Sequence, residues 1–279
     1  MPNPTKTSAG QIYYQTYQTI KKTPVVYLPF LIFAVFEIIA VALVYLFPRM
    51  PFVLVCGPII RTFWGERFLH YPINFLLLPK LAALSRMFLS VILGSLLTGM
   101  AVAIVYKKNY KTAFKKYISL FLIVLIITGL FYLTVKIIGL CLNKYFMAGH
   151  LKLLFLGPRI WLGPILTTIN LVTALLVQSI FVYAIPEVIL NEENPIKCIG
   201  ASFVFFKKHT VLTLILVGLP MLIYLPVVVL NYNTTFLIYR IFPEVILFLA
   251  LSGAIISSLI IDPAITISTA LLYLKSKEK

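Results

Sequence analysis

The sequence predicts an all-α polytopic membrane protein, with about six transmembrane helices arranged as three hairpins and with amphipathic helices at the membrane interface. Hydrophobic residues make up 61% of the chain and charged residues only 11%, whereas soluble domains carry about 25% charged residues. Several apolar stretches run for about 20 residues, the length that crosses about 30 Å of hydrocarbon as a helix. Because lipid offers no hydrogen-bond partner and the stretches lack strict alternation, helices are favoured over barrel strands.

We expect one integral membrane domain over residues 1–279. It consists of a cytoplasmic amphipathic segment (1–23) followed by three hairpins (24–106, 107–190 and 191–279), the last of which carries a basic tail. The six expected spans are Pro24–Phe47, Ala82–Tyr106, Ile118–Cys141, Pro164–Leu190, Thr210–Leu230 and Glu244–Leu274.

Three further features complete this outline. The first 23 residues are polar and rich in Tyr and Gln, so we expect an uncleaved signal anchor and no cleaved signal peptide. The apolar runs Pro51–Ile60 and Ile73–Pro79 are too short to cross and are expected to be interfacial or re-entrant pieces. The last span is long enough to require tilt or a kink at Pro263.

An internal repeat precedes three of the spans. A lysine pair closes each copy, at Lys21–Lys22, Lys115–Lys116 and Lys207–Lys208. The first copy begins with Ser8 and Gln11, which match a helix capping box. The third begins with Asn194 as an N-cap and Pro195 at the first helical position. Helices with aromatics on one face and lysines on the other belong at the membrane surface, although paired lysines also serve as ordinary interface anchors.

The charge pattern sets the expected orientation. The net charge is +16, and alternate loops hold most of the 24 lysines and arginines, which places both termini in the cytoplasm. The basic residues lie at the ends of apolar stretches, which favours anionic membrane lipids as partners and argues against nucleic acid. All six arginines are expected on the outer side: Arg49, Arg61, Arg67, Arg86, Arg159 and Arg240.

We single out three ionisable residues inside expected spans, where charge is costly and often functional. Glu37 lies near the middle of the first span, Asp262 precedes Pro263 in the last span, and Lys136 lies toward the outer end of the third. These residues indicate a proton- or ion-coupled site, or a polar cavity for a lipid headgroup. The alternatives are a buried contact between helices for the two acids and snorkelling to the interface for Lys136.

The outer segments combine arginines with aromatic residues. Arginine binds phosphate with two parallel hydrogen bonds, and Trp and Tyr rings prefer the headgroup layer. We therefore hypothesise a lipid-phosphate site made by Arg61, Arg67 and Arg159. The alternative is an aromatic belt in which these arginines make ordinary headgroup contacts.

The segment Ala184–His209 resembles a pattern found in uncharacterised prokaryotic six-span membrane families, including the membrane domain of some glycerophosphodiester phosphodiesterases. In that pattern a span ends in Pro and an acidic turn, and an amphipathic helix with a basic pair follows. The closing residues Leu271–Lys275 are also similar. The resemblance implies a multi-pass protein of a prokaryotic plasma or inner membrane. Phosphodiesterase chemistry belongs to a separate soluble barrel, which this sequence lacks, so no activity is implied.

The sequence predicts no enzyme. The three histidines are isolated, the three cysteines stand far apart, and no nucleotide-binding fingerprint occurs, so we expect no catalytic residue, metal or cofactor. The first functional hypothesis is a scaffold or accessory subunit that contacts lipids and other membrane subunits. The alternative is a transporter or lipid-handling permease. A scaffold would pack Glu37 and Asp262 tightly, whereas a transporter would place them on the wall of a cavity.

Overall fold

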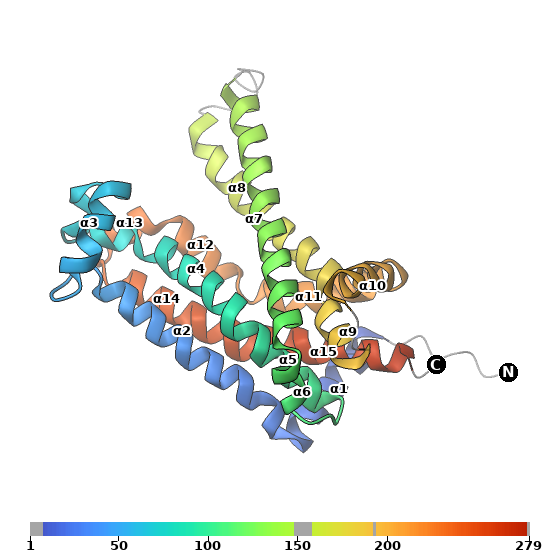
Figure 1. Cartoon of the computed structure of the whole chain (residues 1–279). Coiled ribbons are helices and arrows are strands. Elements are labelled where there is room, and N and C mark those ends of the chain that lie inside the picture. The colour runs from blue at the N-terminus through green and yellow to red at the C-terminus, as the bar shows by residue number, and fades with distance from the viewer. Residues whose placement is uncertain (1–7, 148–157, 192–193, 278–279) are drawn as a thin grey trace.

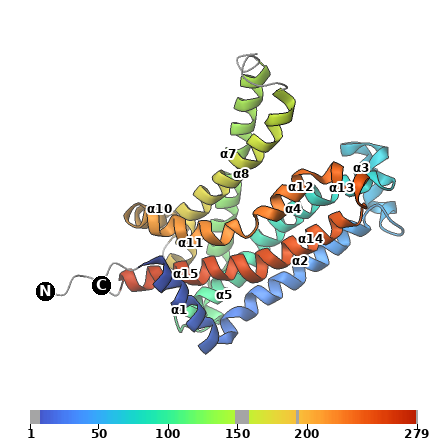
Figure 2. The ribbon, with the colours of Figure 1, turned by 180° about the vertical axis from the view of Figure 1, so that it is seen from behind.

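Helices form two arms that diverge from a shared base. The computed structural model describes residues 8–147, 158–191 and 194–277, and every regular element in these ranges is helical. Figures 1 and 2 show the two arms from opposite sides. The first arm contains α2 (Leu28–Leu46), α3 (Val53–Trp64), α4 (Leu78–Leu89), α12 (Leu225–Tyr232), α13 (Thr234–Arg240) and α14 (Val245–Ile256). The second arm is formed by α7 (Tyr117–Met147) and α8 (Pro158–Phe181).

The remaining helices form the base, where both arms meet. They are α1 (Ala9–Lys22), α5 (Ser95–Val105), α6 (Lys111–Lys115), α9 (Ala184–Asn191), α10 (Pro195–Lys208), α11 (Thr210–Leu222) and α15 (Asp262–Lys277). The largest buried cluster lies here and joins residues of α5, α7, α9 and α15, including Val102, Leu120, Val188 and Ile267. The base is therefore the packed centre from which the arms extend.

Five helical segments of the described chain are long and apolar enough to cross a membrane. They are Pro24–Leu46, Leu78–Val105, Tyr117–Leu142, Leu166–Asn191 and Val245–Lys277. Each matches one of the expected spans to within a few residues. The chain is therefore an all-α polytopic membrane protein, as predicted.

The expected span Thr210–Leu230 is wrong as a continuous helix. The helix α11 ends at Leu222 and α12 begins at Leu225. Pro226 provides a physical reason, because proline has no N–H and so cannot bond to the carbonyl of Leu222, the last residue of α11. At its N-terminal end α11 meets α10 at an angle of 100°. The two helices taken together are long and apolar enough to cross a membrane as one broken span, whereas α11 alone is too short.

The structure confirms both predicted helix starts in the repeated surface segments. At α1 the Ser8 side chain accepts from the Gln11 backbone and the Gln11 side chain accepts from the Ser8 backbone. At α10 the Asn194 side chain accepts from the N–H of Ile196. Both helices have 14 residues, whereas the middle copy, α6, has five. The two short apolar runs also form short helices, α3 and the 3-10 turn η3 (Ile73–Leu76).

Two π-helical turns interrupt the spans of the first arm as they enter the base. The turn η4 (Ser90–Gly94) joins α4 to α5, and η5 (Ser257–Ile261) joins α14 to α15. Such turns occur frequently at functional sites. The second turn ends two residues before Pro263, which cannot donate a backbone hydrogen bond. The span continues through this position as one segment, Val245–Lys277.

The second arm is the more exposed one. Only 11% of the most apolar stretch of Tyr117–Leu142 is buried, compared with 50% for Leu78–Val105. Exposed side chains on α7 include Leu122, Leu130 and Leu133. In a membrane these side chains face lipid, so the arm has little protein packing to hold it in one position.

Candidate functional site

A buried ion cluster joins three of the spans. Arg86 lies on α4, and its Nε atom is 2.9 Å from Oε1 of Glu37 on α2. Its Nη2 atom is 3.4 Å from Oδ2 of Asp262, the first residue of α15. The Glu37 side chain is 2% exposed, whereas those of Arg86 and Asp262 are each 31% exposed. Arg86 is therefore held closely by a fully buried acid and more loosely by a partly exposed one.

Two hydroxyl groups complete this cluster. Nη2 of Arg86 donates to Oγ of Ser257, and the Ser258 hydroxyl donates to Oε2 of Glu37. Both serines belong to the π-helical turn η5. A π-helical turn holds more residues than an α-helical turn, so consecutive side chains diverge less around the axis. The turn thereby directs two consecutive hydroxyls toward the same ion cluster.

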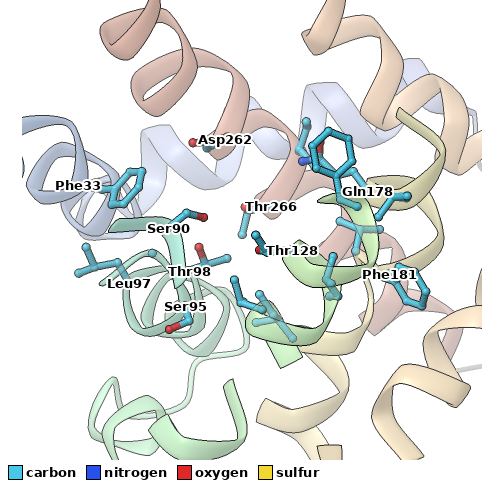
Figure 3. A pocket seen from close by; sticks show the side chains of 18 of the residues that line it. Phe33, Ser90, Ser95, Leu97, Thr98, Thr128, Gln178, Phe181, Asp262 and Thr266 are labelled. Carbon is cyan, nitrogen blue, oxygen red and sulfur yellow. The ribbon is translucent and has the colours of Figure 1, made fainter. Parts of the chain in front are cut away.

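A cavity of about 480 Å³ lies beside the cluster, where the arms meet. It is lined by residues of both arms and of the base, and Arg86 and Asp262 are the charged residues on its wall. Figure 3 shows Ser90, Thr98, Thr128 and Thr266 turned toward a shared space below Asp262. Its volume falls within the range of small-molecule sites, about 300–1,000 Å³.

Much of the remaining cavity wall is apolar. Four phenylalanines line it, Phe30, Phe33, Phe131 and Phe181, together with aliphatic residues of α5, α7, α8 and α15. Sites of this kind bind an apolar body and use a few polar groups to orient it. The cavity therefore suits an amphipathic ligand.

A second cavity, of about 140 Å³, lies on another side of Arg86. Glu37, Ser85, Tyr224 and Asn231 line it together with Arg86. Arg86 lines both cavities, and Glu37 and Asp262 line one each. A change in the position of the guanidinium would therefore alter both spaces.

The structure brings Glu37 and Asp262 together through an arginine that was not singled out as a site residue. Arg86 was counted only among the six arginines expected on the outer side, whereas the structure pairs it with both acids inside the span Leu78–Val105. A sequence signal exists for this pairing. Two acids within spans require a positive partner at similar depth, and Arg86 is well inside its own span.

Lys136 lies apart from the ion cluster. It is exposed on α7, and its Nζ atom is 5.9 Å from the ring centre of Tyr132 on the same helix. This exposed position agrees with the snorkelling alternative, and Lys136 is not among the residues that line the cavity.

The three arginines of the hypothesised lipid-phosphate site are divided between the two arms. Arg61 pairs with Glu66 at 3.5 Å on the exposed tip of the first arm, and Arg67 lies over the ring of Phe68. Arg159 is in the first turn of α8, on the second arm (Figures 1 and 2), and its side chain lies outside the described residues. The structure does not bring Arg159 to the other two.

Within the base, a second polar cluster joins the end of α15 to α9. The side chain of Glu187 on α9 is 6% exposed, and its Oε2 atom is 3.2 Å from Nζ of Lys277 at the end of α15. Asn191 donates to Oε1 of the same carboxylate at 2.5 Å. Lys108 and Lys116 donate to carbonyls near the C-terminal end of α9, where the helix dipole favours positive charge. These contacts are structural and lie away from the ion cluster.

Within the described ranges, no group of three His, Cys, Asp or Glu residues could hold a metal ion. No protein-family model matches this chain, and no curated protein and no solved structure matches it either. The resemblance to the membrane domain of glycerophosphodiester phosphodiesterases therefore stays a prediction. Functional inference depends on the cavity and its ion cluster.

Proposed function

We propose that the protein is a non-enzymatic transporter or lipid-handling permease that binds an amphipathic ligand between its two arms. The observation that carries this proposal is the cavity of about 480 Å³ with Arg86 and Asp262 on its wall. Partly exposed charges inside a span are costly, and they are retained where they meet a ligand, an ion or water. A protein with a purely structural role gains nothing from leaving this space open.

The lining supports both parts of an amphipathic ligand. Phe131 and Phe181 belong to the apolar wall, and Thr128, Thr266 and Asp262 form a polar patch. Since residues of both arms line the cavity, a movement of either arm changes its size. This arrangement suits a binding site that opens and closes during transport.

The scaffold or accessory-subunit hypothesis stays a second prediction, with other membrane subunits as its partners. The surface helices α1 and α10 support it, because both expose aromatic or aliphatic side chains, including Tyr17 and Phe203. The cavity favours the transporter, since tight packing of both acids was expected for a scaffold and Asp262 lines an open space.

We further propose that the protein lies in a prokaryotic plasma or inner membrane with both termini in the cytoplasm and anionic lipids around its base. The lysine-rich helices α1 and α10 and the end of α15 all lie at the base (Figure 1). Lysine-rich segments favour the cytoplasmic side. Fusions of alkaline phosphatase and a fluorescent protein to each terminus test this orientation: phosphatase activity at either terminus would contradict it.

The binding function is tested by filling the cavity. Thr128→Trp places a large ring inside it, whereas Leu133→Trp adds the same ring on the exposed face of the same helix, where the native leucine is 55% exposed. Mass spectrometry of small molecules and lipids retained by each purified protein is the measurement. We expect the wild-type protein and Leu133→Trp to retain one amphipathic species, and Thr128→Trp to lose it at least fivefold. Equal retention by all three proteins would contradict the proposed function.

A further inference from the structure

The ion cluster carries one more negative group than positive. Arg86 supplies one positive charge, and Glu37 and Asp262 supply two carboxylates. Glu37 is the closer partner of Arg86, at 2.9 Å, and its side chain is almost fully buried. Asp262 is the second partner of a guanidinium that is already paired, and it faces the cavity. With both acids ionised, the cluster has a net charge of −1.

An unbalanced charge within a membrane span requires a positive partner. Three charged or titratable groups interact electrostatically with Asp262: Arg86 on α4, Glu37 on α2, and Tyr224, the N-cap residue of α12. Of these three described residues, Arg86 is the one cation, and Glu37 already pairs with it. The missing positive charge must therefore come from a proton or from a ligand in the cavity.

The aromatic lining favours a bulky organic cation. Phe30, Phe33, Phe131 and Phe181 surround the same cavity that Asp262 faces. Aromatic rings attract cations through their negatively charged faces, above all where water is excluded, and they are used to recognise quaternary ammonium groups. A carboxylate supplies the balancing charge, and the rings supply apolar contact at the same time.

We propose that the cavity recognises lipophilic cations, with Asp262 as the group that pairs with the positive charge. This inference depends on the proposed binding function and adds the charge of its ligand. Glu37 acts through Arg86: it neutralises the guanidinium, so that Asp262 is free to attract a cation. A proton competes with the ligand for the same carboxylate.

Two probes of the same shape and opposite charge test this proposal. Tetraphenylphosphonium and tetraphenylborate both carry four phenyl rings around one central atom. Binding of each radiolabelled ion is measured on the full chain in phosphatidylcholine nanodiscs, with empty nanodiscs subtracted. We expect saturable binding of tetraphenylphosphonium and at least tenfold weaker binding of tetraphenylborate. Acidification should weaken phosphonium binding as protons occupy Asp262.

Three variants assign this preference to the cluster. Asp262→Asn and Glu37→Gln each remove the surplus negative charge and should weaken phosphonium binding at least tenfold. Glu66→Gln removes an exposed acid at the tip of the first arm, where it pairs with Arg61, and this variant should bind as the wild type does. If Glu37→Gln fails to fold, Asp262→Asn still decides, because it removes the carboxylate that faces the cavity and leaves Glu37 and Arg86 in place.

Each contrary outcome is informative. Tighter binding of tetraphenylborate would show that Arg86 recognises an anion, which overturns the cation proposal and leaves the binding function intact. Equal binding by wild-type protein and Asp262→Asn, or no binding of either ion, overturns it as well. The proposed function fails separately, when Thr128→Trp retains the same small molecules as the wild type.

Discussion

Arg86 is the residue on which the interior of the first arm depends. Its guanidinium bridges α2 and the start of α15, and it separates two cavities. In lipid the attraction within such a cluster must offset the cost of removing three ionic groups from water. The serines of η5 reduce that cost, because their hydroxyls bond to the guanidinium and to Glu37.

Removing Arg86 alone should destabilise the protein severely. Arg86→Met leaves two carboxylates without a counter-charge, which costs about 3–5 kcal/mol in buried ion pairs. The triple variant Glu37→Gln, Arg86→Met and Asp262→Asn should recover most of this loss, since no buried charge remains. Thermal unfolding in detergent measures both. Arg61→Met, in the exposed pair with Glu66, should change stability by less than about 1 kcal/mol. A triple variant as unstable as Arg86→Met would contradict this account.

The site was predictable from sequence only in part. Glu37 and Asp262 stand out because acids are rare within apolar stretches. Arg86 was not singled out because it was counted with the arginines of the outer segments, and hydropathy does not show which way a side chain within a span points. Ser257 and Ser258 had no signal, since their common direction depends on a π-helical turn that no periodicity indicates.

At the scale of elements, length and hydropathy sufficed to predict five spans, because lipid imposes both on any crossing helix. They failed for Thr210–Leu230, where α11 and α12 are separate helices. The proline at 226 was a signal for this break. The junction of the arms was not predictable, because it depends on contacts between helices distant in sequence, such as α5 and α15.

Gly99 sets the approach of α5 to α7. A Cβ atom at this position would lie 2.5 Å from Cδ1 of Leu120, which is fully buried. Gly99→Ala should therefore destabilise the protein by about 1–3 kcal/mol, and adding Leu120→Ala should lessen the effect of the glycine substitution. Gly129→Ala in α7, where a Cβ meets open space, is the matched control and should be neutral or slightly stabilising. Additive losses in a double-mutant cycle of thermal unfolding would show that the two positions do not interact.

The junction of α10 and α11 should weaken in acid. His209 lies at this junction, with its ring 4.7 Å from that of Phe205 and Nε2 3.4 Å from Oγ of Ser276. Burial, and then the charge of Lys208, lowers the pKa of His209 below its ordinary value of 6.5. The folded protein then binds this proton less readily than the unfolded chain, so stability falls as pH drops through 6.5 and below.

Comparison with His209→Gln tests this effect. Thermal unfolding midpoints are measured from pH 8 to pH 5 for both proteins, and the wild type should lose more stability on acidification than the variant. The variant serves as the control for every other titrating group. Parallel curves would show that His209 does not contribute.

At the scale of the whole molecule, the two arms differ in how firmly they are held. The first arm contains a cluster of six buried residues, Val44, Phe75, Leu78, Leu237, Ile238 and Ile246. The second arm is a hairpin with little buried surface beyond the base. Segments with few buried contacts move most readily. The α7–α8 hairpin is therefore the part of the molecule expected to move when the cavity is occupied.

Ligand binding should bring the arms together. A cation in the cavity contacts α7 and α8 on one side and Asp262 on the other. Closure of the arms adds van der Waals contacts between the ligand and both sides of the cavity. Cys56 on α3 and Cys141 on α7 provide natural labelling sites on the two arms, and the buried Cys198 is replaced by Ser. Pulsed electron paramagnetic resonance of spin labels on Cys56 and Cys141 should show a shorter distance distribution with saturating tetraphenylphosphonium. The Thr128→Trp variant should show no ligand-dependent change, because its cavity is filled. An unchanged distribution in a wild-type protein that binds the ion would show that the arms are fixed, and the cavity would then be a static binding site.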